Sequence, residues 1–242
     1  MTSVATAGTV ALRRRPRWHA YLLLSRVSNL PTVWTNVLAG MCVVSAAIDG
    51  GVYLRVALAM SAFYTGGMFL NDAFDEPFDR VRRPERPIPS GDVSRREVFV
   101  SGTLLLLAGE LLLAPRVQAL VFGGFLAAAI VWYDAQHKGS RFAPVVMGSC
   151  RGLVYCAAAA FAFAITKEAG IAAVVITAYV AALTVVAKLA GPSARWLVPA
   201  LIAAISLVDA TIIAVSGSPT RALFAAIGFP LTLFLQRFIP GD

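Results

Sequence analysis

Long apolar stretches recur along nearly the whole chain, and they constrain its fold more than any other feature. A helix that crosses about 30 Å of hydrocarbon needs roughly 17–25 apolar residues. The stretches are apolar throughout instead of alternating with a period of two, which favours helices over strands. The eight predicted membrane-spanning helices cover residues 30–48, 53–70, 98–114, 117–133, 144–165, 169–187, 196–215 and 222–238.

The composition excludes a soluble domain of the same length. Hydrophobic residues make up 58% of the 242 residues and charged residues 14%, against about 25% charged residues in soluble domains. The three cysteines lie in apolar stretches without a Cys-x-x-Cys pair, so neither a disulfide framework nor a zinc module is expected. We predict an all-α, polytopic membrane helical bundle. It forms a single transmembrane domain over residues 18–242, preceded by a disordered basic tail over residues 1–17.

The basic residues lie mainly on one side of the predicted membrane. With the amino terminus placed in the cytoplasm, 16 of the 21 lysines and arginines fall on the cytoplasmic side and four on the other. By the positive-inside rule, both termini and the long polar loops then lie on the cytoplasmic face of the cell membrane. This distribution explains the net charge of +8 without nucleic acid. Anionic membrane lipid or a phosphorylated substrate remain candidate partners.

The segment directly after the second predicted span carries regularly spaced oxygen ligands. Asn71, Asp75 and Asp79 recur every four residues, so a continuous helix would place them on one face. Like charges at this spacing repel, whereas oxygen ligands suit a hard cation such as Mg²⁺ that bridges to substrate phosphates. We therefore predict that these three residues bind Mg²⁺. Pro77 predicts a kink or break in the helix.

A rigid basic run follows the carboxylates. Residues 82–91 read Arg-Arg-Pro-Glu-Arg-Pro-Ile-Pro-Ser-Gly and include Arg83 and Arg86. Arginine side chains bind phosphate oxygens in a bidentate manner. Carboxylates with a metal and arginines beside them indicate a diphosphate site. The alternative is a solvated, charge-balanced loop.

Two charged residues lie inside predicted spans. Arg151 in the fifth span lies roughly 10 Å below the cytoplasmic end, a depth at which a charge usually faces a cavity or a partner. We expect it to contact substrate; the alternative is that its side chain extends to the interface. Asp209 in the seventh span is consistent with a proton or ion pathway.

With these motifs the chain resembles the UbiA superfamily of intramembrane prenyltransferases. The Asn71-x-x-x-Asp75-x-x-x-Asp79 pattern matches the first aspartate-rich motif of that family, and residues 86–91 resemble the run that follows it. Weaker similarity includes residues 26–32, Asn36, Tyr133 and Lys138, and the resemblance extends over roughly residues 26–187. Residues 133–138 and 147–152 look most like the small ebo-cluster (EboC-like) branch.

The resemblance implies Mg²⁺-dependent transfer of a prenyl group from an isoprenoid diphosphate to an unidentified aromatic or small-molecule acceptor. It implies that the metal ligands are Asn71, Asp75 and Asp79. The residues expected to be catalytic are Asp75, Asp79, Lys138 and Tyr133. The residues expected to bind substrate are Arg26, Asn36, Arg83, Arg86, Asp134, His137, Arg151 and Lys188.

The sequence departs from the family pattern at the end of the sixth span. Family members usually carry a second Asp-x-x-x-Asp motif there, whereas residues 185–195 hold no carboxylate. In one interpretation Lys138, Lys188 and Arg195 bind the diphosphate themselves, and Asp134 or Glu76 is a further ligand of a single Mg²⁺. In the other, the chain is a non-catalytic carrier or transporter of a prenylated or phosphorylated metabolite. The chain also has eight predicted spans where nine are common.

Overall fold

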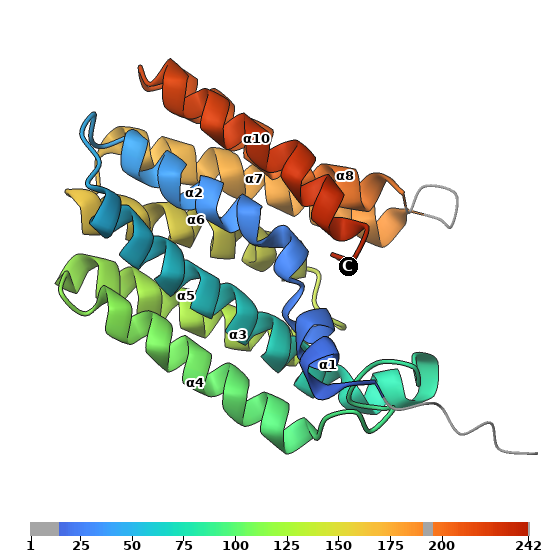
Figure 1. Cartoon of the computed structure of the whole chain (residues 1–242). Helices are drawn as coiled ribbons and strands as arrows, with labels where there is room; N and C mark the ends of the chain where they lie inside the picture. Colours follow the sequence, from blue (N-terminus) through green and yellow to red (C-terminus); the bar gives the residue numbers. More distant parts are fainter. Residues whose placement is uncertain (1–14, 191–195, 242) are drawn as a thin grey trace, which may run out of the picture.

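The computed structural model describes residues 15–190 and 196–241, which fold into a bundle of α-helices (Figure 1). No β-strand occurs in these described ranges. The helices are α1 (Arg17–Ser25), the short 3-10 helix η1 (Val27–Asn29), α2 (Leu30–Cys42), α3 (Gly50–Arg82), α4 (Arg95–Leu113), α5 (Val117–Gln136), α6 (Ala143–Ala162), α7 (Lys167–Leu189), α8 (Leu197–Ala203), α9 (Ile205–Val215) and α10 (Pro219–Gln236).

Polar side chains in the loops fix where three of the long helices begin. The Asp49 carboxylate accepts a hydrogen bond from the Val52 amide at the start of α3. Ser94 and Thr166 cap α4 and α7 in the same way. Such caps contribute about 1 kcal/mol each. From its cap α3 runs for 33 residues, roughly 50 Å, so it is longer than a membrane crossing requires.

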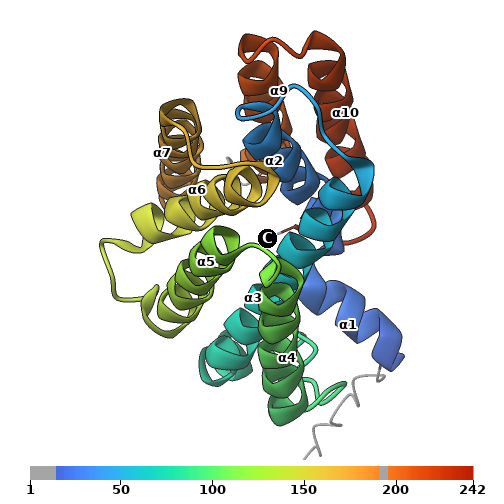
Figure 2. The ribbon, with the colours of Figure 1, turned by 90° about the vertical axis from the view of Figure 1, so that its left-hand side faces the viewer.

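The long helices run side by side along one common direction, and the loops lie at the two ends of the bundle (Figure 1). Helix α3 packs against α2, α4 and α5, while α6 packs against α2, α5 and α7. Helices α9 and α10 pack against each other and against α2 (Figure 2). Helices α2, α3, α5 and α6 therefore surround the interior of the bundle.

Glycines allow two of these helix pairs to approach closely. A Cβ atom on Gly66 of α3 would lie 2.8 Å from the Gly102 carbonyl oxygen of α4. On Gly148 of α6 it would lie 2.3 Å from the Thr177 carbonyl oxygen of α7. Small residues at such contacts are typical of helix packing in membranes.

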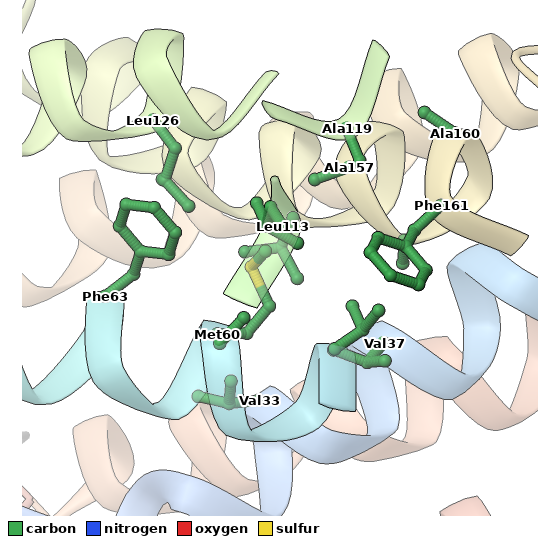
Figure 3. Packing of buried hydrophobic residues seen from close by; sticks show 14 of the residues in the cluster. Val33, Val37, Met60, Phe63, Leu113, Ala119, Leu126, Ala157, Ala160 and Phe161 are labelled. Atoms are coloured by element: carbon green, nitrogen blue, oxygen red, sulfur yellow. The ribbon is translucent and has the colours of Figure 1, made fainter. Parts of the chain in front are cut away.

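A cluster of buried apolar side chains joins the interior helices (Figure 3). Met60 and Phe63 of α3 lie opposite Leu126 of α5, and Phe161 of α6 lies near Val37 of α2. These side chains come from helices that are distant in the sequence, so the cluster fixes the spacing of the bundle.

The protein is an all-α membrane helical bundle, as the sequence predicts. A helix covers each of the eight predicted spans, with α8 and α9 sharing the seventh. Among the described residues, four helical segments are long and apolar enough to cross a membrane, namely 117–136, 143–162, 167–189 and 197–215. The number of crossings stays a prediction.

Three local features go beyond the sequence prediction. Helix α3 continues through Pro77 to Arg82, so of the predicted kink or break the break does not occur. The seventh span is interrupted between α8 and α9, at Ala204. Helix α1, which was not predicted, begins at Arg17, and its Ala20 and Leu24 belong to a buried cluster with Phe69 of α3. Residues 1–14 of the predicted tail lie outside the described residues.

Candidate active site

The polar side chains predicted to act together gather at one end of the bundle, which we call the polar end. It is formed by the last turns of α3, helix α1, the α3–α4 loop and the α5–α6 loop (Figure 1). Because α3 is longer than a crossing requires, its last turns can carry acidic residues beyond the apolar interior.

Asn71 and Asp75 lie on the face of α3 that meets the end of α5. The Asn71 amide donates a hydrogen bond to Asp134 Oδ1 at 3.1 Å. Lys138 Nζ lies 2.7 Å from Asp75 Oδ1, and His137 Nε2 lies 3.8 Å from Asp75 Oδ2. This face therefore combines an amide and two carboxylates with an ammonium group.

Asp72 and Asp79 lie on a second face of α3, where Arg86 bridges them. Arg86 Nη1 lies 2.9 Å from both Asp72 Oδ1 and Asp79 Oδ2. Arg26 Nη2 lies 3.5 Å from Asp72 Oδ1. Burial raises the pKa of the Asp72 carboxyl, while Arg26 and Arg86 oppose that rise.

Helical periodicity explains why the acidic segment divides between two faces. Four residues turn an α-helix slightly more than once, so each step from Asn71 to Asp75 to Asp79 advances about 40° around α3, and Asp79 ends close to Asp72. Asn71 and Asp75 therefore contact residues at the end of α5, while Asp79 contacts Arg86. Their joint role as Mg²⁺ ligands stays a prediction. No three His, Cys, Asp or Glu side chains converge as a metal site among the described residues.

The sequence analysis missed Asp72. The four-residue pattern passes over this residue, although its seven-residue spacing from Asp79 is a second helical period and would have indicated a shared face. In the structure Asp72 is buried and contacts both arginines of this face.

An apolar cavity of about 100 Å³ lies between α2, α3, α5 and α6. A second hollow of about 180 Å³, which we call the polar recess, is bordered by Asp75, His137 and Lys138. Asp134 lines both, and its buried Oδ2 atom has no hydrogen-bond partner among the described residues. The Asp134 side chain therefore borders both the apolar cavity and the polar recess.

Tyr133 and His137 lie at the boundary between these two spaces. Their rings stack with centroids 4.9 Å apart. Tyr133 lines the apolar cavity, and His137 borders the polar recess. Lys138 is positioned by a second contact, because its Nζ atom lies 4.1 Å from the centre of the Phe78 ring.

Arg151 lines the apolar cavity and belongs to a hydrogen-bonded network inside the bundle. Its Nη1 donates to Asn36 Oδ1 at 2.8 Å and its Nη2 to Thr32 Oγ1 at 3.1 Å. The Asn36 amide donates to both carboxylate oxygens of Asp209, at 2.8 and 2.9 Å.

Asp209 receives further hydrogen bonds from the hydroxyls of Thr35 and Tyr155. Its carboxylate is fully buried and its hydrogen-bonding capacity is used by neighbouring helices. These contacts account for the intramembrane acid, so Asp209 gives no support to a carrier or transporter.

Two of the cationic residues predicted to bind substrate do not lie beside the carboxylates of α3. Arg83 and Lys188 are exposed and form no ion pair with any described residue. Arg83 lies directly after α3, and Lys188 lies in the last turn of α7. Arg195 lies outside the described residues.

The fold and site together define a membrane helical bundle in which an apolar cavity shares Asp134 with a recess bordered by a carboxylate and a cation. Residues 31–190 match the model of the UbiA prenyltransferase family. The chain belongs to this family. Assignment to the ebo-cluster branch stays a prediction.

The chain is also similar in sequence to individual curated proteins. The chain is 33% identical to digeranylgeranylglyceryl phosphate synthase from Methanopyrus kandleri over 138 residues, which cover 54% of this chain and 50% of that protein. The chain spans 30% of the length of digeranylgeranylglyceryl phosphate synthase from Ignicoccus hospitalis and 50% of that from Methanopyrus kandleri.

Solved structures share the fold. One, from work on digeranylgeranylglyceryl phosphate synthase in membranes, has a TM-score of 0.61 at 18% identity and covers 90% of this chain and 96% of that chain. A UbiA homologue from Archaeoglobus fulgidus bound to DMAPP and Mg²⁺ has a TM-score of 0.60 at 13% identity. That match covers 90% of this chain and 86% of the other.

Proposed function

We propose that this protein transfers a prenyl group from an isoprenoid diphosphate to an acceptor within the membrane, in a Mg²⁺-dependent reaction. One observation carries the proposal: Asp134 lines both the apolar cavity and the polar recess. An isoprenoid diphosphate has the same two parts, an apolar chain and a strongly anionic group. The family relationship and the ligands named for the Archaeoglobus fulgidus homologue support the same reaction.

In this proposal Lys138, Arg86 and Arg26 bind diphosphate oxygens. Each now neutralises a carboxylate of α3, and an incoming diphosphate is the alternative partner. Charge-assisted hydrogen bonds from arginine to phosphate are strong and directional. They stabilise the diphosphate as the allylic C–O bond breaks and its electron pair leaves with the oxygen.

The apolar cavity protects the allylic carbocation that remains. Most of its walls are hydrocarbon, so little water is available to react with the cation. Tyr133 lines the cavity close to the polar recess and would face the reacting carbon. The acceptor then forms a bond to this carbon and loses a proton.

The donor atoms at the recess fit Mg²⁺ in chemical type. Asn71, Asp75 and Asp134 offer amide and carboxylate oxygens, and the buried Asp134 Oδ2 has no described partner. Asp79 offers a further carboxylate on the second face of α3. When bound, Mg²⁺ would supply charge neutralisation for the departing diphosphate.

We further propose that the polar end lies in the cytoplasm with both termini. Sixteen of the 21 lysines and arginines fall on this side when the amino terminus is cytoplasmic. This orientation would admit isoprenoid diphosphates from the cytoplasmic side and leave the apolar chain among the helices.

The test is ligand-dependent thermal stability of the detergent-purified protein, combined with a mass-spectrometric search for altered acceptors. Farnesyl diphosphate with Mg²⁺ should raise the melting temperature, because a ligand at 100 times its dissociation constant stabilises by about 2.7 kcal/mol. Omitting Mg²⁺, or changing Asp75→Asn, should remove most of this shift.

Asp49→Asn is the matched control. It makes the same carboxylate-to-amide change roughly 39 Å from Asp75 along α3, and asparagine caps a helix as well as aspartate does. This variant should keep the full shift. An equal shift in Asp75→Asn would contradict the metal assignment, and transport of unaltered farnesyl diphosphate would contradict catalysis.

A further inference from the structure

Helix α1 carries apolar side chains on two opposite faces. Ala20 and Leu24 belong to a buried cluster with Phe69 of α3. Trp18 and Leu22 lie two residues before them, and two residues turn a helix by about 200°. They therefore share the outward face, where Trp18 is 66% exposed and Leu22 is partly exposed. One apolar face packs on the bundle, and the other is left open by the described residues.

The attachment point places α1 at the level of the lipid headgroups. Helix α1 extends outward from the bundle at the polar end (Figure 2), and η1 joins it directly to α2. Phe69, on which α1 packs, lies 19 residues after Gly50, the start of α3. This separation is roughly 29 Å along the helix, close to the thickness of the hydrocarbon layer. The outward face of α1 is therefore expected near the boundary between lipid chains and headgroups.

Arginines lie beside this face. Arg17 begins α1 and contacts Glu97 in the first turn of α4. This contact brings the start of α1 close to the start of α4, where Arg95 and Arg96 are exposed. Three guanidinium groups and one carboxylate leave a net positive charge at this junction.

An exposed tryptophan beside arginines matches the chemistry of an anionic phospholipid. Indole rings favour the boundary between lipid chains and headgroups. Arginine side chains can lie along apolar surface and still reach phosphate groups with their guanidinium heads. Leaving the Trp18 and Leu22 face in water would cost the free energy of its apolar area. A lipid leaflet covers this area and supplies the anions.

We propose that α1 is an interfacial helix that binds anionic phospholipid at the polar end. Trp18 and Leu22 insert beside the lipid chains, and Arg17 and Arg96 bind headgroup phosphates. This surface is separate from the apolar cavity and the polar recess, because none of these residues lines either space. Arg26 directly follows α1 and contacts Asp72, so anchoring of the helix also fixes the point from which Arg26 extends.

The first experiment locates Trp18 in the full chain, reconstituted into lipid nanodiscs. Tryptophan fluorescence is recorded with phosphatidylcholine brominated either near the headgroup or near the end of the acyl chain. Trp18→Phe provides the matched control, because the difference between wild type and this variant isolates Trp18 from the other three tryptophans. Quenching of Trp18 should be stronger with bromine near the headgroup. Absence of quenching with either lipid would overturn the proposal, because Trp18 would then face water or protein.

The second experiment measures lipid affinity from the melting temperature in a neutral detergent. Dioctanoyl phosphatidylglycerol should stabilise the protein at lower concentration than dioctanoyl phosphatidylcholine. Arg17→Gln and Arg96→Gln should each lower the affinity for phosphatidylglycerol about 5-fold and leave that for phosphatidylcholine unchanged. Trp18→Ser should weaken the binding of both lipids about tenfold, because it removes the apolar insertion.

Arg116→Gln is the matched control for net charge. It removes an exposed arginine between α4 and α5, at the opposite end of α4, and should keep the preference for phosphatidylglycerol. An equal loss in this variant, or equal affinity of the wild type for both lipids, would overturn the proposal. Equal stabilisation by glycerol phosphate would also overturn it, since the arginines would then bind free phosphate. If a variant fails to fold, the wild-type comparison of the two lipids still decides.

Discussion

The polar end and the interior of the bundle neutralise charge in different ways. At the polar end, cations and carboxylates touch directly: Lys138 lies 2.7 Å from Asp75, and Arg86 lies 2.9 Å from Asp79. In the interior, Arg151 and Asp209 are connected through the amide of Asn36. The first arrangement consists of ion pairs, and the second of hydrogen bonds to neutral groups.

Exposure explains what each arrangement is suited to do. The Lys138 side chain is 41% exposed, whereas Asp209 is 0% exposed. Exposed ion pairs contribute little and exchange readily with solutes, while a buried charge is costly to leave unpaired. Lys138 at the polar end can therefore exchange its carboxylate partner for an anionic substrate, and the inner network is suited to remain fixed.

The largest predicted effect comes from the inner network. Asp209→Leu should destabilise the protein by about 3–5 kcal/mol, because it leaves the Arg151 charge uncompensated and the Tyr155 hydroxyl without an acceptor. Thermal unfolding of the variant in detergent measures this loss. Asp49→Asn, a surface cap change, is the control and should unfold close to wild type. If Asp209→Leu lost little stability, the hydrogen bonds that connect Arg151, Asn36 and Asp209 would not be needed to hold the interior of the bundle.

A smaller effect is expected where direct ion pairs lie partly buried. Arg86→Gln removes the cation that bridges Asp72 and Asp79, and should cost about 1–3 kcal/mol. The cost is lower than for Asp209 because Arg26 still lies 3.5 Å from Asp72. The melting temperature of the variant tests this, and Arg86→Lys should recover part of the loss. If Arg86→Gln lowered the melting temperature more than Asp209→Leu does, the ion pairs of the polar end would contribute more stability than the inner network.

The sequence predicts the helical bundle well, because apolar runs of 17 or more residues leave few alternatives in a membrane. It also predicts the segment that carries the site, since the spacing of Asn71, Asp75 and Asp79 is visible in the sequence. The same reasoning allowed a break at Pro77 that does not occur, because α3 continues as a helix to Arg82.

The tertiary partners were less accessible to sequence reasoning. The contact between Arg86 and Asp72 depends on how the α3–α4 loop folds back, and no periodicity encodes that turn. The pairing of Asn36 with Asp209 joins residues 173 positions apart through the packing of α2 on α9. Arg151 could be placed in a membrane-spanning segment, but its neutral partners could not be read from its neighbours in the sequence.

The smallest effect is expected for an ion pair that is exposed at the polar end. Arg17 of α1 contacts Glu97 of α4, and their side chains are 66% and 36% exposed. Because water and salt screen such a pair, Arg17→Gln should leave the melting temperature unchanged within error and should not alter farnesyl diphosphate binding. Arg17→Gln makes the same arginine-to-glutamine change as Arg86→Gln, but at an exposed site. A loss as large as that of Arg86→Gln would show that exposure does not determine which cations at this end can exchange partners.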